Sequence, residues 1–288
     1  MKTSKFKVPP GKKVKLSDYR TDYIGDIESK KDASKLLKAN TKKMAELQDR
    51  LYAHDRYGLL LIFQAMDAAG KDSTIKHVMS GVNPQGTQVF SFKQPSAEEL
   101  DHGYLWRIAK AVPERGRIGI YNRSHYEDVL VVRVHDLIKG QKIPKKFDND
   151  GIWRKRFNQI KNFEKYLYEN GIITIKFFLH ISKDEQRKRF LRRLDIPSKN
   201  WKFSAADLKE REYWEDYQKC YEEAIAATST DYAPWYITPA DKKWFTRLVV
   251  SNVIIDTLQS LNLEYPELDE NQKKNLNVYR EQLMNDLR

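Results

Sequence analysis

Apolar residues along the chain form short continuous runs that alternate with stretches of helical periodicity. The clearest run covers residues 59–63 and reads Leu-Leu-Leu-Ile-Phe, and other runs follow at residues 89–92, 118–121, 172–179 and 234–238. A short apolar run that ends at a turn is typical of a strand buried on both faces. Apolar residues three or four positions apart predict helices over residues 41–53, 73–79, 98–112, 153–168 and 241–261.

This alternation predicts an α/β fold in which helices cover both faces of a parallel sheet. The composition divides the chain into three parts. Residues 1–40 are predicted to be a basic N-terminal arm extended on the surface, and residues 41–262 are predicted to be the main domain. Within that domain, residues 183–235 are rich in arginine and aromatic residues and predict a helical lid. Residues 263–288 predict a charged helical tail.

The balance of charge narrows the class of partner. Among the 288 residues, Lys and Arg number 52 and Asp and Glu number 40, so the net charge is +12. Such a surplus favours a polyanionic partner. Nucleic acid, an anionic membrane and a phosphate polymer all suit this charge, so charge alone does not choose among them.

Other sequence features bear on the compartment. The chain has one cysteine, Cys220, so no disulfide can form within it and a reducing compartment suits it. The first fifteen residues are basic but lack the apolar run of a secretory signal. The longest apolar stretch, residues 172–181, is too short and too polar to span a bilayer. We therefore expect a cytoplasmic protein without a membrane partner.

The turn after the first predicted strand contains a pattern close to that of a phosphate-binding loop. Residues 67–73 read Asp-Ala-Ala-Gly-Lys-Asp-Ser, and the pattern requires a glycine, four residues, Gly-Lys and then Ser or Thr. In such a loop, backbone N–H groups at a helix N-terminus bind phosphate, Gly70 permits close approach, and Lys71 contacts the phosphate that is transferred. The residues expected to line this phosphate site are Ala68, Ala69, Gly70, Asp72 and Ser73.

Three residues set this loop apart from the usual pattern. Ala65 stands in the place of the first glycine, and Asp72 stands where Ser or Thr commonly contacts magnesium. Asp67 would repel phosphate unless a cation lay between them, so it can hold magnesium or act as a base on the incoming phosphate. The alternative is that the segment is an ordinary strand-to-helix turn, in which the side chain of Asp67 only bonds its own backbone.

Polar residues also crowd the end of the strand predicted at 118–121, where residues 122–128 read Asn-Arg-Ser-His-Tyr-Glu-Asp. Parallel strands bind ligands at their carboxyl ends, so we expect this segment to lie beside the phosphate-binding loop. Arg123 would bridge phosphates, and either Glu127 or Asp128 could hold magnesium. Further candidates for phosphate or nucleotide contact are Asn122 and Arg133. For the two acids, a helix N-terminus that favours negative charge is the alternative explanation.

Basic residues are also concentrated between positions 187 and 193. Arg189, Arg192 and Arg193 share one face of a predicted helix. Arginine binds phosphate through its planar fork, so Arg189 and Arg193 are candidates to hold phosphates from a lid. A solvated basic face that pairs with Asp184 and Glu185 is the alternative.

Taken together, these segments resemble the family-2 polyphosphate kinases. The similar segments are residues 67–71, 122–128, 186–193, 201–202 and 228–235, and the resemblance covers residues 30–262. The resemblance implies a P-loop kinase-like, three-layer α/β/α sandwich with a helical lid. It also implies that Lys71 contacts the transferred phosphate, that Asp67 works with magnesium, and that Arg123 and Arg189 hold phosphates. Many family members have aspartate in place of Asn122, and an amide lacks the charge for a direct metal role. The sequence of residues 122–128 resembles the subgroup that phosphorylates both nucleoside mono- and diphosphates.

We therefore expect reversible transfer of the terminal phosphoryl group of inorganic polyphosphate to ADP or GDP, giving ATP or GTP, and to AMP. Asp67 and Glu127 are the expected ligands of Mg²⁺, for which Mn²⁺ could substitute. An ATP-dependent nucleotide kinase is the alternative. A nucleic-acid-binding protein would need a zinc-ligand spacing or a helix-turn-helix pattern, and the sequence contains neither. Aromatic residues on predicted surface helices favour a homo-oligomer.

Overall fold

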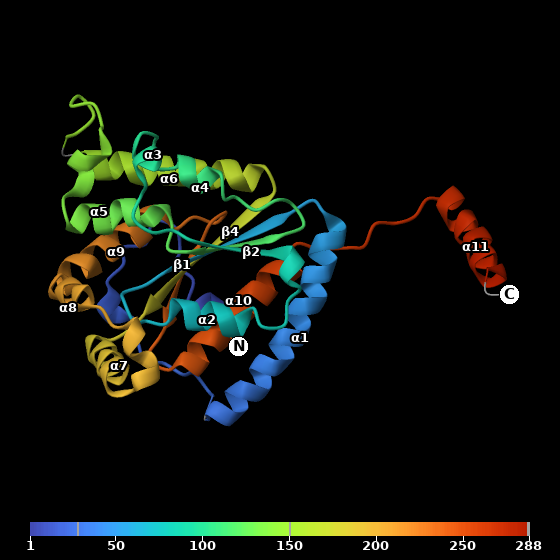
Figure 1. The fold of residues 1–288 in the computed structure, drawn as a ribbon, viewed down its shortest axis with the longest axis horizontal. Helices are drawn as coiled ribbons and strands as arrows, with labels where there is room; N and C mark the ends of the chain where they lie inside the picture. The colour runs from blue at the N-terminus through green and yellow to red at the C-terminus, as the bar shows by residue number, and fades with distance from the viewer. Residues whose placement is uncertain (28, 150, 287–288) are drawn as a thin grey trace.

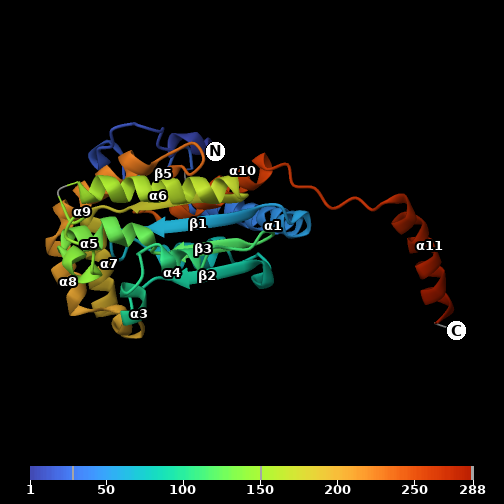
Figure 2. The ribbon, with the colours of Figure 1, turned by 90° about the horizontal axis from the view of Figure 1, so that it is seen from above.

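The computed structural model describes residues 1–27, 29–149 and 151–286. Its centre is a five-stranded sheet in the order β2-β3-β1-β4-β5, and neighbouring strands run parallel (Figures 1 and 2). The strands are β1 (Gly58–Gln64), β2 (Thr87–Ser91), β3 (Ile118–Asn122), β4 (Ile172–His180) and β5 (Trp235–Pro239). This order places β1 in the middle of the sheet. The parallel α/β architecture predicted from the sequence is confirmed.

Helices form a layer on each side of the sheet. They are α1 (Lys30–His54), α2 (Lys71–Val78), α3 (Ala97–Leu100), α4 (Trp106–Ala109), α5 (Val131–Val134), α6 (Ile152–Glu169), α7 (Lys183–Asp195), α8 (Ala205–Glu212), α9 (Trp214–Thr228), α10 (Lys243–Ser260) and α11 (Glu270–Asn285). Helix α10 packs against α1 and α2 on one face, and α6 packs against β4 and α9 on the other. In Figure 1, α1, α2 and α10 lie below the sheet and α3, α4 and α6 lie above it.

Strand β1 is the most deeply buried part of the sheet. All of its residues are buried, and Leu61 pairs with Ile120 of β3 and Ile175 of β4. Burying one large aliphatic side chain contributes about 1.5–3 kcal/mol relative to exposing it. The continuous apolar sequence of β1 therefore anchors this strand firmly, and the loop that follows it is mounted on the rigid centre of the molecule.

The N-terminal segment differs from the predicted surface arm. Phe6, Val8, Val14 and Leu16 are buried in the core, and the N–H of Val8 donates to the carbonyl oxygen of Trp235 at 2.9 Å. The carbonyl oxygen of Phe6 also accepts from the N–H of Ile237 at 2.9 Å, so this segment pairs with the edge strand β5, which would otherwise be exposed. Helix α1 begins at Lys30 and not at residue 41, because Ser29 caps it by accepting a hydrogen bond from the N–H of Asp32.

A second difference concerns the helix predicted over residues 98–112. The structure contains two short helices there, α3 and α4, which are separated by residues 101–105. Ser96 and Glu99 form a capping box that starts α3, and Gly103 lies in the break between the helices. Glycine disfavours a helix interior, so the apolar periodicity of this segment is divided between two helices.

The carboxyl ends of the strands point toward α5, α7, α8 and α9 (Figure 2). The segment predicted as a lid contains α7, α8 and α9 and ends where β5 begins at Trp235. The tail contains α11, which extends away from the rest of the molecule in Figures 1 and 2. Residues 287–288, the last two of the tail, lie outside the described residues. Within the described ranges, no helix is both long enough and apolar enough to cross a membrane.

Candidate functional site

The turn between β1 and α2 has the backbone of an anion-binding loop. Ala68 and Gly70 have positive φ angles of 57° and 107°, and Gly70 is the N-cap of α2. Lys71 is the first residue of α2, and its Nζ donates to the carbonyl oxygen of Ala65 at 3.0 Å. The left-handed residues turn the chain so that the N-terminus of α2 faces the carboxyl edge of the sheet, where an anion is favoured.

Ala65 and Asp72, which depart from the usual loop pattern, are accommodated in different ways. Ala65 is buried, and its φ is not among the positive values that would require glycine. Oδ1 of Asp72 accepts a hydrogen bond from Nδ2 of Asn122 at 2.6 Å. Asp72 therefore ties the start of α2 to the end of β3, and this contact brings the two sequence motifs together.

Arg123 lies across the loop from Asp67. The φ of Arg123 is 65°, and its N–H donates to the carbonyl oxygen of Phe63 at 3.1 Å, so the residue is held at the end of β1. Its Nη2 lies 3.6 Å from Oδ1 of Asp67, and both side chains are partly exposed. Burial opposes the charge of Arg123, but the carboxylates of Glu127 and Asp67 outweigh it and raise the pKa of this guanidinium.

Lys71 and Glu127 carry opposite charges in the same partly desolvated place. Burial lowers the pKa of Lys71, and the nearby carboxylate of Asp67 works against this shift. Burial likewise raises the pKa of Glu127, while Arg123 and Lys71 work against it. In such surroundings each charge interacts more strongly with its neighbours than it would in water.

Arg189 of α7 borders the loop from the other side. Its Nη1 donates to the carbonyl oxygens of Ala68 and Ala69, and its Nη2 donates to those of Ala240 and Asp241, at 2.6–3.1 Å. Nε donates to Glu185 at 2.8 Å, and the side chain is only 6% exposed. In this structure the guanidinium therefore fixes the loop between β1 and α2 to the end of β5.

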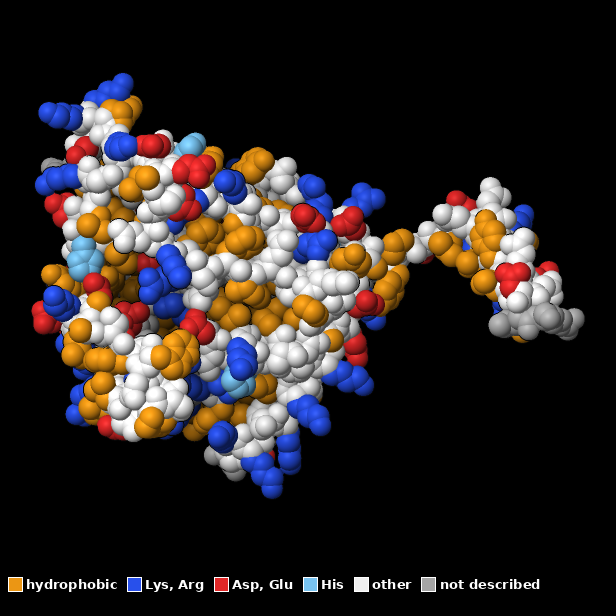
Figure 3. All heavy atoms as spheres, in the orientation of Figure 1, with side chains coloured by type: hydrophobic (Ala, Val, Ile, Leu, Met, Phe, Trp, Pro, Cys, Tyr) orange, Lys and Arg blue, Asp and Glu red, His pale blue; other side chains and the backbone are white. Residues whose placement is uncertain are grey.

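Two cavities meet at the loop. One has a volume of about 580 Å³ and is called the basic cavity, because nine of its lining residues are Lys or Arg and three are Asp. Its cations are Lys71, Lys93, Arg123, Arg189, Arg192, Arg193, Lys199, Lys202 and Lys243. Figure 3 shows Lys and Arg side chains gathered beside a hollow between the levels of α5 and α7. So many cations around one cavity favour an anion with several charges.

The other cavity has a volume of about 460 Å³ and is called the tyrosine cavity. Tyr217 and Tyr221 of α9 line it, together with Glu127 and Glu210. It shares Asp67, Lys71, Arg123 and Asp207 with the basic cavity. The loop thus stands between a cavity rich in cations and one that also offers aromatic rings and carboxylates.

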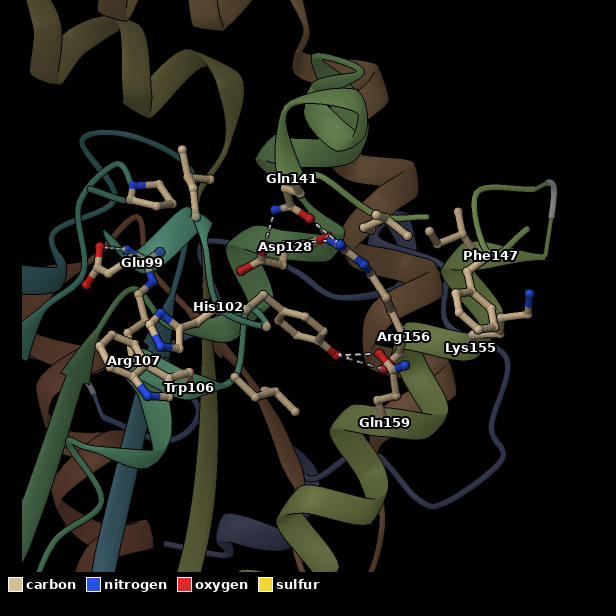
Figure 4. A pocket seen from close by; sticks show the side chains of 17 residues that line it. Glu99, His102, Trp106, Arg107, Asp128, Gln141, Phe147, Lys155, Arg156 and Gln159 are labelled. Carbon is tan, nitrogen blue, oxygen red and sulfur yellow. Dashed lines mark hydrogen bonds and ion pairs between the residues drawn. The ribbon is translucent and has the colours of Figure 1, made fainter. Parts of the chain in front are cut away.

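Glu127 and Asp128 face different cavities, although they are adjacent in sequence. Glu127 lines the tyrosine cavity, whereas Asp128 lines a third cavity of about 550 Å³ between α4 and α6 (Figure 4). There Asp128 accepts a hydrogen bond from Gln141 at 2.6 Å, and its Oδ1 lies 3.6 Å from Arg156. Of the two acids that the sequence left open as magnesium ligands, only Glu127 therefore faces the loop.

Some of the remaining candidate residues from the sequence line the two cavities, and others do not. Ser73 and Arg193 line the basic cavity, where Arg193 pairs with Asp207 at 3.0 Å. The structure does not bring Arg133 to either cavity that meets the loop: it pairs with Glu223 at 2.6 Å and lies over the ring of Trp153. Tyr126, which lies next to Glu127 in sequence, is fully buried in the core, so it offers no free face to a ligand.

The sequence analysis did not identify two cations of α10. Lys243 lines the basic cavity, and Arg247 donates to Oγ of Ser73 at 2.8 Å. Both residues lie near the start of a helix that directly follows β5. Their position in the sequence could have predicted this, because the residues that follow each parallel strand lie at the same edge of the sheet.

The carboxylates of this site suit a magnesium ion that is shared with phosphate. In the described part of the chain, no three His, Cys, Asp or Glu side chains gather closely enough to hold a metal ion by themselves. Protein sites commonly hold Mg²⁺ with one or two carboxylates, and substrate phosphates and water supply the other ligands. Asp67 and Glu127 line the same cavity, and the charge of Asp67 adds to the raised pKa of Glu127. A bound cation would relieve this repulsion, so the pair fits Mg²⁺.

Comparison with known proteins gives consistent matches over most of the chain. The family model described as polyphosphate kinase 2 matches residues 27–266. An ADP-polyphosphate phosphotransferase of Rhodopseudomonas palustris is 52% identical over 287 residues, which cover 99% of each chain. An AMP/ADP-polyphosphate phosphotransferase of Meiothermus ruber is 45% identical, covering 91% of this chain and 95% of its own. The crystal structure of polyphosphate kinase 2 from Arthrobacter aurescens matches with a TM-score of 0.86 and 40% identity over 95% of each chain.

Proposed function

The chain belongs to the polyphosphate kinase 2 family, and we propose the reaction that its two cavities support best. The protein is a phosphotransferase that moves the terminal phosphoryl group of inorganic polyphosphate to a nucleotide. Its acceptors are ADP, GDP and AMP, and the reaction is reversible. The observation that carries this proposal is the meeting of the basic cavity and the tyrosine cavity at Asp67, Lys71 and Arg123.

The basic cavity is the place for the polymer. Polyphosphate carries about one negative charge on each internal phosphate and has no bases to recognise, so rows of Lys and Arg suffice to bind it. Arg189 and Arg193 bind protein groups, and the seven other cations of the lining still exceed what the phosphates of one nucleotide need. The alternative of an ATP-dependent nucleotide kinase would not require so long a basic lining, and the relatives at 52% and 45% identity are named for polyphosphate.

The tyrosine cavity is the place for the acceptor nucleotide. Tyr217 and Tyr221 form part of its wall and are only 8% and 4% exposed, so a base would contact the small ring areas that they leave open. Lys71 and Arg123 lie where this cavity joins the basic cavity. An acceptor phosphate placed at that junction would meet the terminal phosphate of a polymer held on the other side. Because the two substrates approach from different cavities, their reacting oxygen and phosphorus atoms can line up for an in-line displacement.

The proposed chemistry needs no covalent intermediate on the protein. An oxygen of the acceptor phosphate forms a bond to the terminal phosphorus, and the bridging P–O bond to the rest of the polymer breaks. The shortened polymer keeps the electron pair as a new terminal oxygen. The acceptor is already an oxyanion, so no general base is required. Lys71, Arg123 and the magnesium ion, held by Asp67 and Glu127, would stabilise the charge that develops on the transferred group.

The range of acceptors can be tested with a panel of nucleotides. Ring faces bind either purine, so we expect ADP and GDP to react with kcat/KM values within about tenfold of each other. AMP should give ADP and then ATP. Initial rates with each nucleotide, polyphosphate and Mg²⁺ measure this, and Mn²⁺ should support a measurable rate. If AMP yielded no ADP while ADP yielded ATP, the proposed use of monophosphates would be wrong.

Lys243 should make polyphosphate binding depend on pH. Burial and the cations Arg189, Arg192 and Arg247 lower the pKa of Lys243 to about 8, with Glu185 acting in the opposite direction. Below this pH the ammonium is protonated and attracts polyphosphate, and above it the charge is lost. The KM for polyphosphate should therefore rise about twofold to fivefold between pH 7 and pH 9, as expected for one partly exposed charge contact.

Two variants isolate this effect. Lys243→Arg keeps its charge over the whole pH range, so its KM for polyphosphate should stay flat, whereas Lys243→Met should show a high KM throughout. Steady-state kinetics at fixed ionic strength gives these values. An equal rise of KM with pH in Lys243→Met and in the wild type would contradict the assignment to Lys243.

We propose a homo-oligomer, supported by exposed apolar and aromatic side chains such as Trp201 and Tyr213. The cytoplasm is the proposed compartment, since nucleotides and magnesium are available there and the single cysteine, Cys220, is free and buried.

A further inference from the structure

A fully buried ion pair lies behind the segment that carries Glu127. Lys176 of β4 and Glu164 of α6 are both 0% exposed, and their Nζ and Oε2 atoms are 2.5 Å apart. Nζ of Lys176 also donates to the carbonyl oxygen of Thr228 at 2.8 Å. Burial alone would raise the pKa of Glu164, but the ammonium of Lys176 outweighs it and lowers this pKa, so the carboxylate is held ionised inside the core.

Tyr126 connects this ion pair to the turn His125–Val129, which carries Glu127. Its hydroxyl donates to Oε1 of Glu164 at 2.8 Å and lies 2.9 Å from Oγ1 of Thr228. The indole Nε1 of Trp235 donates to the same Oγ1 at 2.9 Å. Thr228 and Trp235 are the two ends of the sequence segment 228–235, which resembles its family counterparts, yet both residues are buried away from the basic and tyrosine cavities.

Ser124 and Asp128, on either side of Glu127, are held by hydrogen bonds as well. Ser124 accepts a hydrogen bond from Gln64 at 3.2 Å, and the imidazole Nε2 of His125 lies 3.7 Å from Glu164. Asp128 is held by Gln141 and Arg156 on the opposite side (Figure 4). In the run 124–128, every side chain except that of Glu127 is buried, and Glu127 alone lines the tyrosine cavity.

We propose that the buried network of Lys176, Glu164, Tyr126 and Thr228 positions the Glu127 carboxylate for catalysis. None of the four side chains lines the basic or the tyrosine cavity, so each acts through the backbone of the turn His125–Val129. This inference rests on the proposed function of Glu127. In this proposal, residues 228–235 hold the turn His125–Val129 in place.

Two physical arguments support a positioning role. A buried ion pair is a poor source of stability, because apolar residues of similar volume usually stabilise a core as well or better. A fully satisfied polar network, however, fixes the relative placement of its members, since each hydrogen bond has a preferred direction and length. Here the network joins four elements, α6, β4, α9 and the turn that carries Glu127. The network therefore determines the position of the turn that carries the Glu127 carboxylate.

Tyr126→Phe tests this proposal, with Tyr121→Phe as the matched control. Both tyrosines are fully buried, and the hydroxyl of Tyr121 makes a single hydrogen bond, at 2.8 Å, to the carbonyl oxygen of Ile108. Each variant loses a buried hydroxyl, and Tyr126→Phe should be the less stable of the two because its hydroxyl also bonds a buried carboxylate. Activity is therefore compared at a temperature at which thermal unfolding shows both variants to be folded. Only Tyr126→Phe should lower kcat, by about tenfold, and raise the Mg²⁺ concentration that gives the half-maximal rate, by about threefold, while the KM for polyphosphate stays unchanged.

Amide hydrogen exchange provides a readout that does not need activity. Residues 124–130 should exchange faster in Tyr126→Phe than in the wild type, and Tyr121→Phe should leave their exchange unchanged. Equal kcat, Mg²⁺ dependence and exchange in Tyr126→Phe and the wild type would overturn the positioning role. So would equal losses in both variants. A wild-type protein that is inactive on polyphosphate would instead count against the proposed function, because the exchange measurement would still report on the network.

Discussion

A Lys71→Met variant is expected to lose most of its polyphosphate-driven phosphoryl transfer, with kcat lowered by about 10²–10³, the effect of removing one preorganised charge-stabilising group. Lys71 begins α2, and its Nζ is held 3.0 Å from the carbonyl oxygen of Ala65, at the junction of the two cavities. Methionine has a similar length but carries no charge. The transition state of phosphoryl transfer spreads charge over the moving group, so the loss should fall mainly on kcat.

Lys76→Met is the matched control, because Lys76 is an exposed residue of the same helix. It should keep kcat within about twofold of the wild type. Burial already lowers the pKa of Lys71, so its ammonium is held at a cost and its replacement should not reduce the free energy of unfolding. Initial rates and thermal unfolding of both variants measure this. A Lys71→Met enzyme that retained more than about a tenth of the wild-type kcat would contradict the role given to this residue.

A Lys176→Met variant is expected to lose about 3–5 kcal/mol of unfolding free energy, the usual cost of breaking a buried pair by removing one partner. Lys176 and Glu164 are both fully buried, so the variant would leave an unpaired carboxylate in the core. The carbonyl oxygen of Thr228 would also lose its donor. Denaturant unfolding followed by circular dichroism gives the difference directly.

The double variant Lys176→Met with Glu164→Gln separates the two causes of this loss. Glutamine removes the stranded charge but still offers an acceptor to the hydroxyl of Tyr126, so we expect more than half of the lost stability to return. A double variant that is as unstable as Lys176→Met would show that the loss comes from packing and not from the unpaired carboxylate.

The parts of the fold that the sequence predicted are those determined by local patterns. The apolar run at residues 59–63 lies within β1, and the following Gly-Lys pair lies at the start of α2. Apolar run and turn are adjacent along the chain, so both are visible in the sequence. The break between α3 and α4 was missed, because helical periodicity continued across Gly103 although the helix did not.

The parts that could not be predicted depend on contacts between distant residues. The sequence placed Arg189 on a basic helix face, but nothing local indicates that its guanidinium reaches the carbonyls of Ala68 and Ala240. These oxygens follow different strands, and their spacing is determined by the folded sheet. The N-terminal residues are a similar case, since Val8 becomes buried only when β5 is in place beside it.

The sequence also could not show which of the adjacent residues Glu127 and Asp128 faces the site. A helical turn would have left Glu127 and Asp128 on neighbouring faces, so the sequence could not choose between them. In the structure they belong to a short 3-10 turn, His125–Val129, which directs Glu127 toward the loop and Asp128 toward Arg156. The buried network that holds this turn comes from α6, β4 and α9, far away in the sequence.

A single assay can follow the transfer of phosphate from polyphosphate to a nucleotide. The purified full chain is incubated with Mg²⁺, polyphosphate and either ADP or AMP, without ATP, and chromatography follows both the nucleotides and the length of the polymer. We predict ATP from ADP, ADP and then ATP from AMP, and one phosphate lost from the polymer for each phosphate gained by a nucleotide. The Lys71→Met variant should form almost none of these products. Absence of nucleotide products with polyphosphate, together with phosphate transfer to AMP once ATP is supplied, would contradict the account.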